Sequence, residues 1–566
     1  MSERQFLPKE WKITGKDDVI PYYDTLLSRE ISSIEALRSF LRDVSELDSA
    51  VSEDMAWRYI RMTCDTLNKE HEASYLTFVQ EIQPHLAPLE DTLNKKILDC
   101  TYTAELEKEK SFAIYFRSLR GAVELFREEN VPLQAELQSL AQEYSAIQGA
   151  MGITYDGKEF TMQQAGNFLL QTDRELREKI WNLMYERRNA DVEKLESLFD
   201  KMLQKRHQVA LNAGFKNFRD YMFKALGRYD YNVEDCYAFH SAIEKNVVPL
   251  YKNLMQKRKE QLGYTTLKPW DTSVDSLGRA PLKPFDNGTE LLEKSLLCLG
   301  KIDAYFSECL EYMKGHQLLD LESRKGKAPG GYNYPLAESN VPFIFMNASG
   351  NLRDVETLVH EGGHAVHSFL MAPLEITAFK NTPSEIAELA SMSMELLSMD
   401  GWDAFFENKD ELQRAKMEQL EGIIGTLPWI ANVDAFQHWI YENPGHTREE
   451  RANKWLELSS RFGTGLIDYT GIEDAIKYSW HKQLHIFEIP FYYIEYGFAQ
   501  LGAIGMWKRY TENHATGIED YKKALKLGYT KTIPEVYAAA GLSFNFSENY
   551  VNELFGFLQK QMDVLD

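Results

Sequence analysis

The sequence predicts a mainly α-helical protein, and two patterns carry that prediction. Across residues 103–128 and 172–205, apolar residues recur every three or four positions with charged residues between them, which is the spacing of amphipathic helices. Glycine and proline are few, with 33 and 18 among 566 residues, and no Gly/Ser/Pro-rich linker or internal repeat interrupts the chain. The length is compatible with several domains or with one large helical body.

Composition excludes several classes of partner. The formal net charge of −23 argues against a nucleic-acid surface and against binding to an anionic membrane. No run approaches the roughly 20 apolar residues of a membrane span, and the first residues lack the apolar core of a secretory signal. Scattered cysteines, odd in number, indicate reduced thiols rather than a disulfide framework. We therefore expect a soluble, cytoplasmic protein. The cysteines are Cys64, Cys100, Cys236, Cys298 and Cys309.

Two segments break the helical pattern. Residues 152–164, GITYDGKEFTMQQ, predict a small β-hairpin that turns at Asp156 and Gly157. Residues 325–351 are rich in glycine and proline and then give an apolar run at 341–346 that predicts a strand. Irregular backbone beside a candidate site is where ligand-contacting loops tend to lie, although a plain surface loop fits this sequence equally well.

The next helix carries the motif H-E-x-x-H. His360 and His364 are four residues apart, so both imidazoles share one helical face and can bind a single Zn²⁺. Glu361 lies beside that face and can act as the general base on a water whose pKa the zinc has lowered. Histidines placed by coincidence are the alternative. His367 follows one turn later, where three ligands from one straight helix would fit one ion poorly, so we favour an outer role. The metzincin pattern needs a histidine where Leu370 stands.

The third ligand has to come from another segment. The stretch NTPSEIAELASMSMELLSM predicts a second helix with Thr382 as N-cap, Pro383 at its first position and Glu385 closing a capping box. Glu388 and Glu395 are seven residues apart and share one face of that helix. Three glutamates therefore compete for the role of third ligand.

Together these blocks resemble the thimet oligopeptidase and oligoendopeptidase F family of zinc peptidases. The resemblance rests on HEGGHAVHSF, on a glutamate 24 residues after the second histidine, on GKAPGGYNY and PFIFMNASGNLRDVETLVHE, and on HIFEIPFYYIEYGFAQLG. It covers residues 151–566, which we take as the catalytic region, with residues 1–150 as an N-terminal helical region forming part of a channel wall. Gly362 is a departure, because family members usually carry a bulky apolar residue there.

The resemblance implies a large helical ellipsoid with a deep substrate channel and a small β element beside the zinc helix. It implies one Zn²⁺ per chain and short, unfolded oligopeptide substrates. The strand at residues 341–346 would lend its edge to an extended peptide.

Within this frame we predict Glu388 as the third ligand. Glu385 already has a use in the capping box. Glu395 lies two turns beyond Glu388, roughly 10 Å away, and suits an outer position that supports a ligand histidine. A ligand near the start of the second helix lets that helix cross the first close to His364, and Gly363 removes bulk at the crossing.

The block WHKQLHIFEIPFYYIEYGF supplies further candidates. His485, Tyr492 and Tyr496 fall at i, i+7 and i+11, close to one face of a helix. The family uses a histidine and tyrosines of this block to hydrogen-bond the oxyanion and the substrate backbone. Tyr493 is the alternative if the register is off by one, and an aromatic core stripe is the structural alternative. For His481 the default is a solvent-facing helix position.

The sequence thus predicts a zinc-dependent endopeptidase acting on oligopeptides with Glu361 as general base. A zinc carboxypeptidase of similar fold is the first alternative, and it would need a cationic anchor for the terminal carboxylate of its substrate. A non-catalytic peptide-binding protein is the second. A purely structural zinc site has no use for Glu361, which speaks against that reading.

Overall fold

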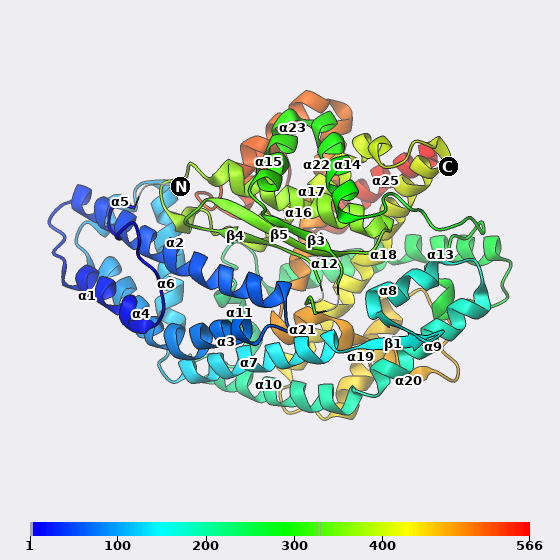
Figure 1. The fold of residues 1–566 in the computed structure, drawn as a ribbon, viewed down its shortest axis with the longest axis horizontal. Helices are drawn as coiled ribbons and strands as arrows, with labels where there is room; N and C mark the ends of the chain where they lie inside the picture. Colours follow the sequence, from blue (N-terminus) through cyan, green and yellow to red (C-terminus); the bar gives the residue numbers. More distant parts are fainter. Residues whose placement is uncertain (1–3, 325, 329, 566) are drawn as a thin grey trace.

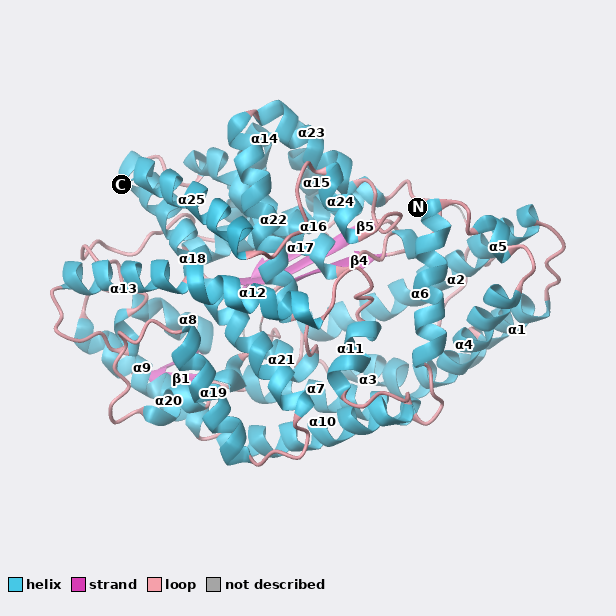
Figure 2. Cartoon of the chain, turned by 180° about the vertical axis from the view of Figure 1, so that it is seen from behind, coloured by secondary structure: helices cyan, strands magenta, loops and turns pink. Residues whose placement is uncertain are grey.

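The computed structural model describes residues 4–324, 326–328 and 330–565 and is mainly α-helical, as predicted (Figures 1 and 2). Its first helices are α1 (Ile20–Ser28), α2 (Ile34–Cys64), α3 (Lys69–Thr77), α4 (Gln83–Asp99), α5 (Thr103–Leu106), α6 (Lys110–Leu125) and α7 (Asn130–Gly149). The hairpin β1 (Gly152–Tyr155) and β2 (Lys158–Thr161) follows.

The middle of the chain holds a second run of helices and a small sheet. The helices are α8 (Met162–Gly166), α9 (Arg174–Asn189), α10 (Val192–Asn212), α11 (Phe218–Ala225), α12 (Val233–Asn246), α13 (Val248–Leu262), α14 (Gly288–Ile302) and α15 (Ala304–Gly315). The strands are β3 (Leu319–Glu322), β4 (Tyr332–Leu336) and β5 (Val341–Ala348).

The remainder is helical. It comprises α16 (Leu352–Met371), α17 (Ser384–Ser398), α18 (Lys409–Glu442), α19 (Arg448–Phe462), α20 (Glu473–Lys477), α21 (Leu484–Glu488), α22 (Tyr493–Glu512), α23 (His514–Leu525), α24 (Ile533–Ala539) and α25 (Glu548–Leu565). No helix in the described part of the chain is both long and apolar enough to cross a bilayer.

The N-terminal helices enclose an apolar core of their own. Buried residues from α1, α2, α4 and α6, among them Phe40 and Phe112, cluster there with Ile376 and Phe379 from the segment after α16. Figure 1 shows these helices at one end of an elongated molecule. The division of the chain at residue 150 stays a prediction.

The two predicted amphipathic stretches are helical but interrupted. Within residues 103–128 the chain forms α5 and α6, and residues 126–128 lie beyond the end of α6; residues 172–205 contain α9 and most of α10. The breaks, of three and two residues, are too short to be detected from apolar spacing over the whole stretch.

The predicted hairpin is confirmed. β1 and β2 pair antiparallel with Tyr155 opposite Lys158. Asp156 and Gly157, between them, have φ of 50° and 72°, as the tight turns that suit twisted strands require.

The sheet beside α16 has the order β3-β5-β4. β5 pairs parallel with β3 and antiparallel with β4, so the expectation that residues 341–346 lend an edge to a peptide is wrong: both edges of β5 are already paired. Among the described strands, β3 and β4 each pair with β5 alone, so each has an outer edge that no other strand occupies. β4 also packs against α16.

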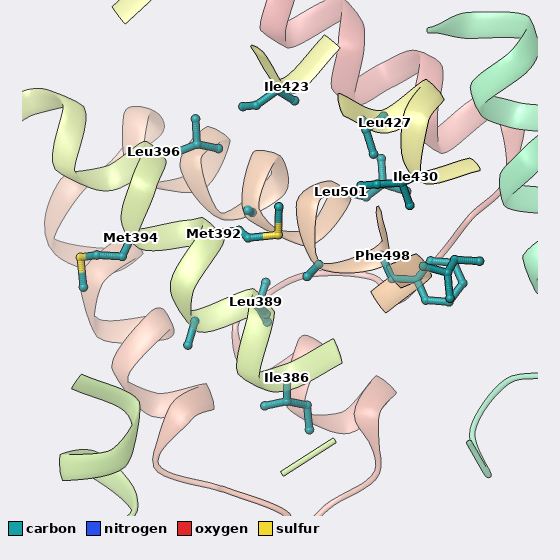
Figure 3. Close-up of a cluster of buried hydrophobic side chains, with 14 of the residues drawn as sticks. Ile386, Leu389, Met392, Met394, Leu396, Ile423, Leu427, Ile430, Phe498 and Leu501 are labelled. Carbon is teal, nitrogen blue, oxygen red and sulfur yellow. The ribbon is translucent and has the colours of Figure 1, made fainter. Parts of the chain in front are cut away.

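α17 lies in the centre of the largest core. Figure 3 shows Ile386, Leu389, Met392 and neighbouring side chains of α17 against Ile423, Leu427 and Ile430 of α18 and Phe498 and Leu501 of α22. Full burial of such a side chain stabilises the fold by roughly 1.5–3 kcal/mol. The helix that carries Glu388 is thus held firmly from several sides.

Candidate active site

Three predicted ligands converge between α16 and α17. Nε2 of His360 and Nε2 of His364 lie 3.4 and 3.6 Å from Oε2 of Glu388. The three ligand atoms all lie within 4.8 Å of one another. Two imidazoles and one carboxylate are a donor set that suits Zn²⁺ with one coordination position open.

Gly363 allows α16 and α17 to pack close together at their crossing. A Cβ on Gly363 would lie 2.6 Å from Cα of Ser391 and 2.7 Å from the backbone oxygen of Ala390, so any larger residue would push α16 and α17 apart. The expected role of Gly363 at the crossing is confirmed. A Cβ on Gly362 would meet only Leu299, at 3.7 Å, so this departure from the family pattern leaves ordinary room.

Further hydrogen bonds hold the ligand side chains in place. Nδ1 of His360 lies 2.7 Å from Oε1 of Glu395, whose other oxygen accepts from Nε2 of Gln419 at 2.9 Å. Glu395 therefore contacts the far side of a ligand histidine, as predicted. Glu388 accepts from the hydroxyl groups of Tyr492 at 2.7 Å and Ser391 at 3.0 Å. Such outer contacts fix ring orientation and tautomer.

The ionisable ligands are strongly perturbed. Burial works against the charge of Glu388, but the nearby His364 and His360 outweigh it and lower its pKa to about 2. Burial lowers the pKa of His364 to about 4. Burial also opposes a charge on His360, yet Glu388 and Glu395 raise its pKa well above the usual value. The site thus presents a fixed negative charge to two imidazoles, which favours a bound cation.

Glu361 is buried beside the ligands. It is 6% exposed, and its Oε2 has no hydrogen-bond partner among the described residues. Burial raises its pKa to about 7, and the charge of His360 opposes that rise. A carboxylate with such a pKa can accept and return a proton near neutral pH.

The capping box predicted at residues 382–385 is wrong. α17 begins at Ser384 with Pro383 as N-cap, and no side chain caps it. The side chain of Glu385 is buried, and the nearby Arg228 charge works against the rise that burial causes in its pKa. Glu385 does not belong to the converging ligand group, but the reason is this inward orientation rather than a cap.

Two other histidines, His367 and His481, are buried outside the group of candidate ligands. His367 is buried, outside the converging group, and its Nε2 has no partner in the described part of the chain. His481 is also buried, with Nε2 at 2.8 Å from Oε1 of Glu196. The prediction that His481 faces solvent is therefore wrong. His481 lies in a short 3-10 helix, Ser479–Lys482, that packs on α10.

The tyrosine-rich block is not one helix. α21 ends at Glu488 and α22 begins at Tyr493, with Phe491 at φ 69° between them. Pro490 explains the break, because proline lacks the amide hydrogen and disfavours helix in the residue before it. The predicted i, i+7, i+11 face is therefore wrong as geometry.

The break still brings the predicted rings together. The His485 ring centroid lies 5.7 Å from that of Tyr492 and 5.5 Å from that of Tyr496. Tyr492 contacts Glu388, whereas the ring of Tyr493 packs on His485 at 4.9 Å. Of the two alternatives, Tyr492 is the residue that reaches a candidate ligand.

Two residues that the sequence reading missed orient His485. The indole nitrogen of Trp429 donates to Oε1 of Gln483 at 2.8 Å, and Nε2 of Gln483 lies 2.8 Å from Nδ1 of His485. Because an indole N–H can only donate, the glutamine oxygen faces Trp429 and its amide donates to Nδ1. Burial lowers the pKa of His485 to about 4, so the ring is neutral and its hydrogen sits on Nε2. The Nε2–H faces the Tyr496 hydroxyl at 3.4 Å.

Comparisons with known proteins agree with this geometry. A family model described as peptidase family M3 matches residues 168–555, and one described as the peptidase M3 N-terminal domain matches residues 17–126. A solved structure described as Pz peptidase A with inhibitor 2 superimposes with a TM-score of 0.93 at 26% identity, covering 99% of this chain and 100% of that one.

Several curated relatives carry the name oligoendopeptidase F. The chromosomal oligoendopeptidase F of Lactococcus lactis is 25% identical over 56% of this chain. The match spans about half of that relative, 52% of its length. An oligoendopeptidase F homolog of Borreliella burgdorferi is 24% identical over 91% of this chain and 85% of its own length.

Proposed function

The chain belongs to peptidase family M3, and from this premise we propose that it is a zinc-dependent endopeptidase that hydrolyses short, unfolded oligopeptides. The observation that carries the proposal is the convergence of His360, His364 and Glu388 beside the buried carboxylate of Glu361. The donor set fits Zn²⁺. Oε2 of Glu361 has no hydrogen-bond partner among the described residues, so it is free to accept a proton as a general base. When bound, the ion would polarise the scissile carbonyl and acidify the attacking water.

The protein groups would share the remaining work. Glu361 would take the proton of the attacking water and return it to the leaving amine. The neutral His485 and the hydroxyl of Tyr496 would donate hydrogen bonds to the oxygen on which charge develops. The hydroxyl of Tyr492 donates to Glu388 in this structure. We therefore assign Tyr492 two roles: it holds the Glu388 carboxylate in place, and it hydrogen-bonds the substrate.

The substrate would bind in extended form along the open edge of β4. Asn333 of β4 donates to the backbone oxygen of Glu361 at 3.2 Å, which ties this edge to the residue that acts as base. Backbone pairing at a strand edge accepts many sequences, as an oligopeptidase needs. The same proposal places the protein in the cytoplasm, with the five cysteines present as free thiols.

The test is cleavage of a ladder of quenched oligopeptides with every product end mapped. We expect internal cuts that a chelator abolishes and Zn²⁺ restores. Glu361→Gln should bind zinc normally and lose several orders of magnitude in kcat. Glu356→Gln, a buried glutamate on the same helix that pairs with Arg353 at 3.0 Å, is the matched control and should stay within a few-fold of the parent.

Each alternative predicts another pattern. Sequential loss of single C-terminal residues would identify a carboxypeptidase. Binding without any cleavage would identify a peptide-binding protein. Activity of Glu361→Gln within tenfold of the parent would assign the base to another group.

A further inference from the structure

A cavity of about 380 Å³ lies between α9, α18, α20 and the short helix Ser479–Lys482. Its wall is aromatic and charged and includes Trp181, Tyr185, Arg188, Trp429, Asp474 and Lys482. In Figure 1 the helices α9, α10 and α20 that form one side of it lie below the sheet.

Two cations and one carboxylate lie in this wall. Neither Arg188 nor Lys482 forms an ion pair with any described residue, although Asp474 lines the same cavity. The Lys482 ammonium lies 4.9 Å from the ring centroid of Trp429, a contact that favours a cation. The neighbouring Arg187, by contrast, pairs with Asp191 at 2.5 Å.

Both side chains are exposed on the cavity wall, where a ligand in the cavity can reach them. The surrounding protein lowers the pKa of Arg188, and it lowers the pKa of Lys482 to about 8, with the charge of Arg188 adding to the effect. Two like charges on one wall repel each other, and an anion placed between them relieves that repulsion. The chain has 86 acidic residues, yet none of the described ones forms an ion pair with Arg188 or Lys482. The arrangement is explained if an anionic ligand enters the cavity and binds both cations.

The cavity wall is continuous with the candidate active site. Trp429, which contacts Lys482, also donates to Gln483, and Gln483 holds Nδ1 of His485. Lys482 is three residues before His485, so their Cα atoms are at most about 11 Å apart. An extended peptide advances roughly 3.3 Å per residue. An anion held by Lys482 therefore belongs to a residue only a few positions from the scissile bond.

We propose that Arg188 and Lys482 form a carboxylate-binding subsite that selects oligopeptides bearing an anionic group a few residues from the cleaved bond. The carboxylate is either the C-terminus of the peptide or the side chain of an Asp or Glu. Arginine suits a two-pronged contact with the carboxylate and lysine adds a point charge. The inference rests on the proposed function and names the substrate class of the same site.

The experiment compares matched peptides on matched variants. One quenched peptide is made with a free C-terminus and as the C-terminal amide, and each form is made with Glu or Gln at successive positions. Lys482→Met and Arg188→Met should each raise KM at least tenfold for peptides that carry the recognised carboxylate, with little change in kcat. Peptides without it should be hardly affected. Arg187→Met, one residue away and already paired, is the control and should behave as the parent.

The experiment distinguishes the two possible sources of the carboxylate, the C-terminus of the peptide and an acidic side chain. Preference for acid over amide identifies the C-terminus, and preference for Glu over Gln at one position identifies a side chain. Equal losses on charged and neutral peptides, or no loss in either variant, would overturn the subsite.

Binding measurements on Glu361→Gln separate this inference from the proposed function. Affinity for the carboxylate-bearing peptide should exceed that for its neutral match, and Lys482→Met or Arg188→Met in the same background should remove the difference. That result stands even if the parent protein cleaves no peptide. Equal affinity for both peptides would refute the subsite while cleavage by the parent leaves the peptidase proposal intact.

Discussion

Gln483 decides how His485 faces the reaction. The indole of Trp429 donates to Oε1 of Gln483, which leaves the NH₂ group of the same amide facing His485. That NH₂ group donates a hydrogen bond to Nδ1 of His485. The imidazole therefore keeps its hydrogen on Nε2, directed to the side where Tyr496 lies. A neutral donor held in one orientation costs no reorganisation when charge develops on the substrate oxygen.

Replacing this glutamine should therefore affect the chemical step. In Gln483→Met the imidazole loses its orienting hydrogen bond, and we expect kcat to fall ten- to hundredfold with KM nearly unchanged. Steady-state kinetics on one quenched peptide measure the two constants. Trp429→Phe, which removes only the donor that fixes the amide, should give a smaller loss of kcat. A rise in KM at constant kcat would make His485 a ground-state substrate contact instead.

At the scale of elements, the crossing of α16 and α17 places the ligands. Gly363 lies against the backbone of Ser391 and Ala390, and Gly362 does not. Gly363→Ala should force the helices apart, lower Tm and weaken zinc binding. Gly362→Ala should keep zinc and stabilise the protein by up to about 1 kcal/mol, because glycine is a poor helix former. Thermal unfolding and elemental analysis of both variants test this, and equal behaviour of the two would contradict the role given to the crossing.

The sequence anticipated those parts of the site that local spacing determines. His360 and His364 had to share a helical face, and the seven residues from Glu388 to Glu395 predicted one inner and one outer carboxylate. It failed where distant segments decide. The pairing of β5 on both edges depends on β3 and β4, and Glu385 is buried near the charge of Arg228, which comes from a distant part of the chain. Pro490 was a local signal for the broken helix that the reading overlooked.

At the scale of the whole molecule, buried histidines should make the fold sensitive to acid. Burial lowers the pKa of His367 to about 3 and that of His485 to about 4, and it also lowers the pKa of His240 and His481. Between pH 6.5 and 4 these rings bind protons in the unfolded chain but not in the folded one, so stability falls as pH falls.

The measurement is Tm against pH at fixed zinc concentration. His367→Leu removes one such group and should make the fall between pH 6.5 and 4 shallower. The exposed His514, replaced by Gln, is the control and should leave the curve unchanged. A His367→Leu curve that parallels the parent would show that His367 does not contribute to the acid sensitivity.

The central claim is that His360, His364 and Glu388 hold one catalytic zinc ion, and titration of the zinc-free protein tests it most directly. Peptidase activity and bound metal are followed together as Zn²⁺ is added. Activity should rise linearly and level off at one equivalent per chain, and Glu388→Ala should bind no zinc tightly and stay inactive. Full activity before any zinc is added, or tight zinc binding and cleavage by Glu388→Ala, would contradict the account.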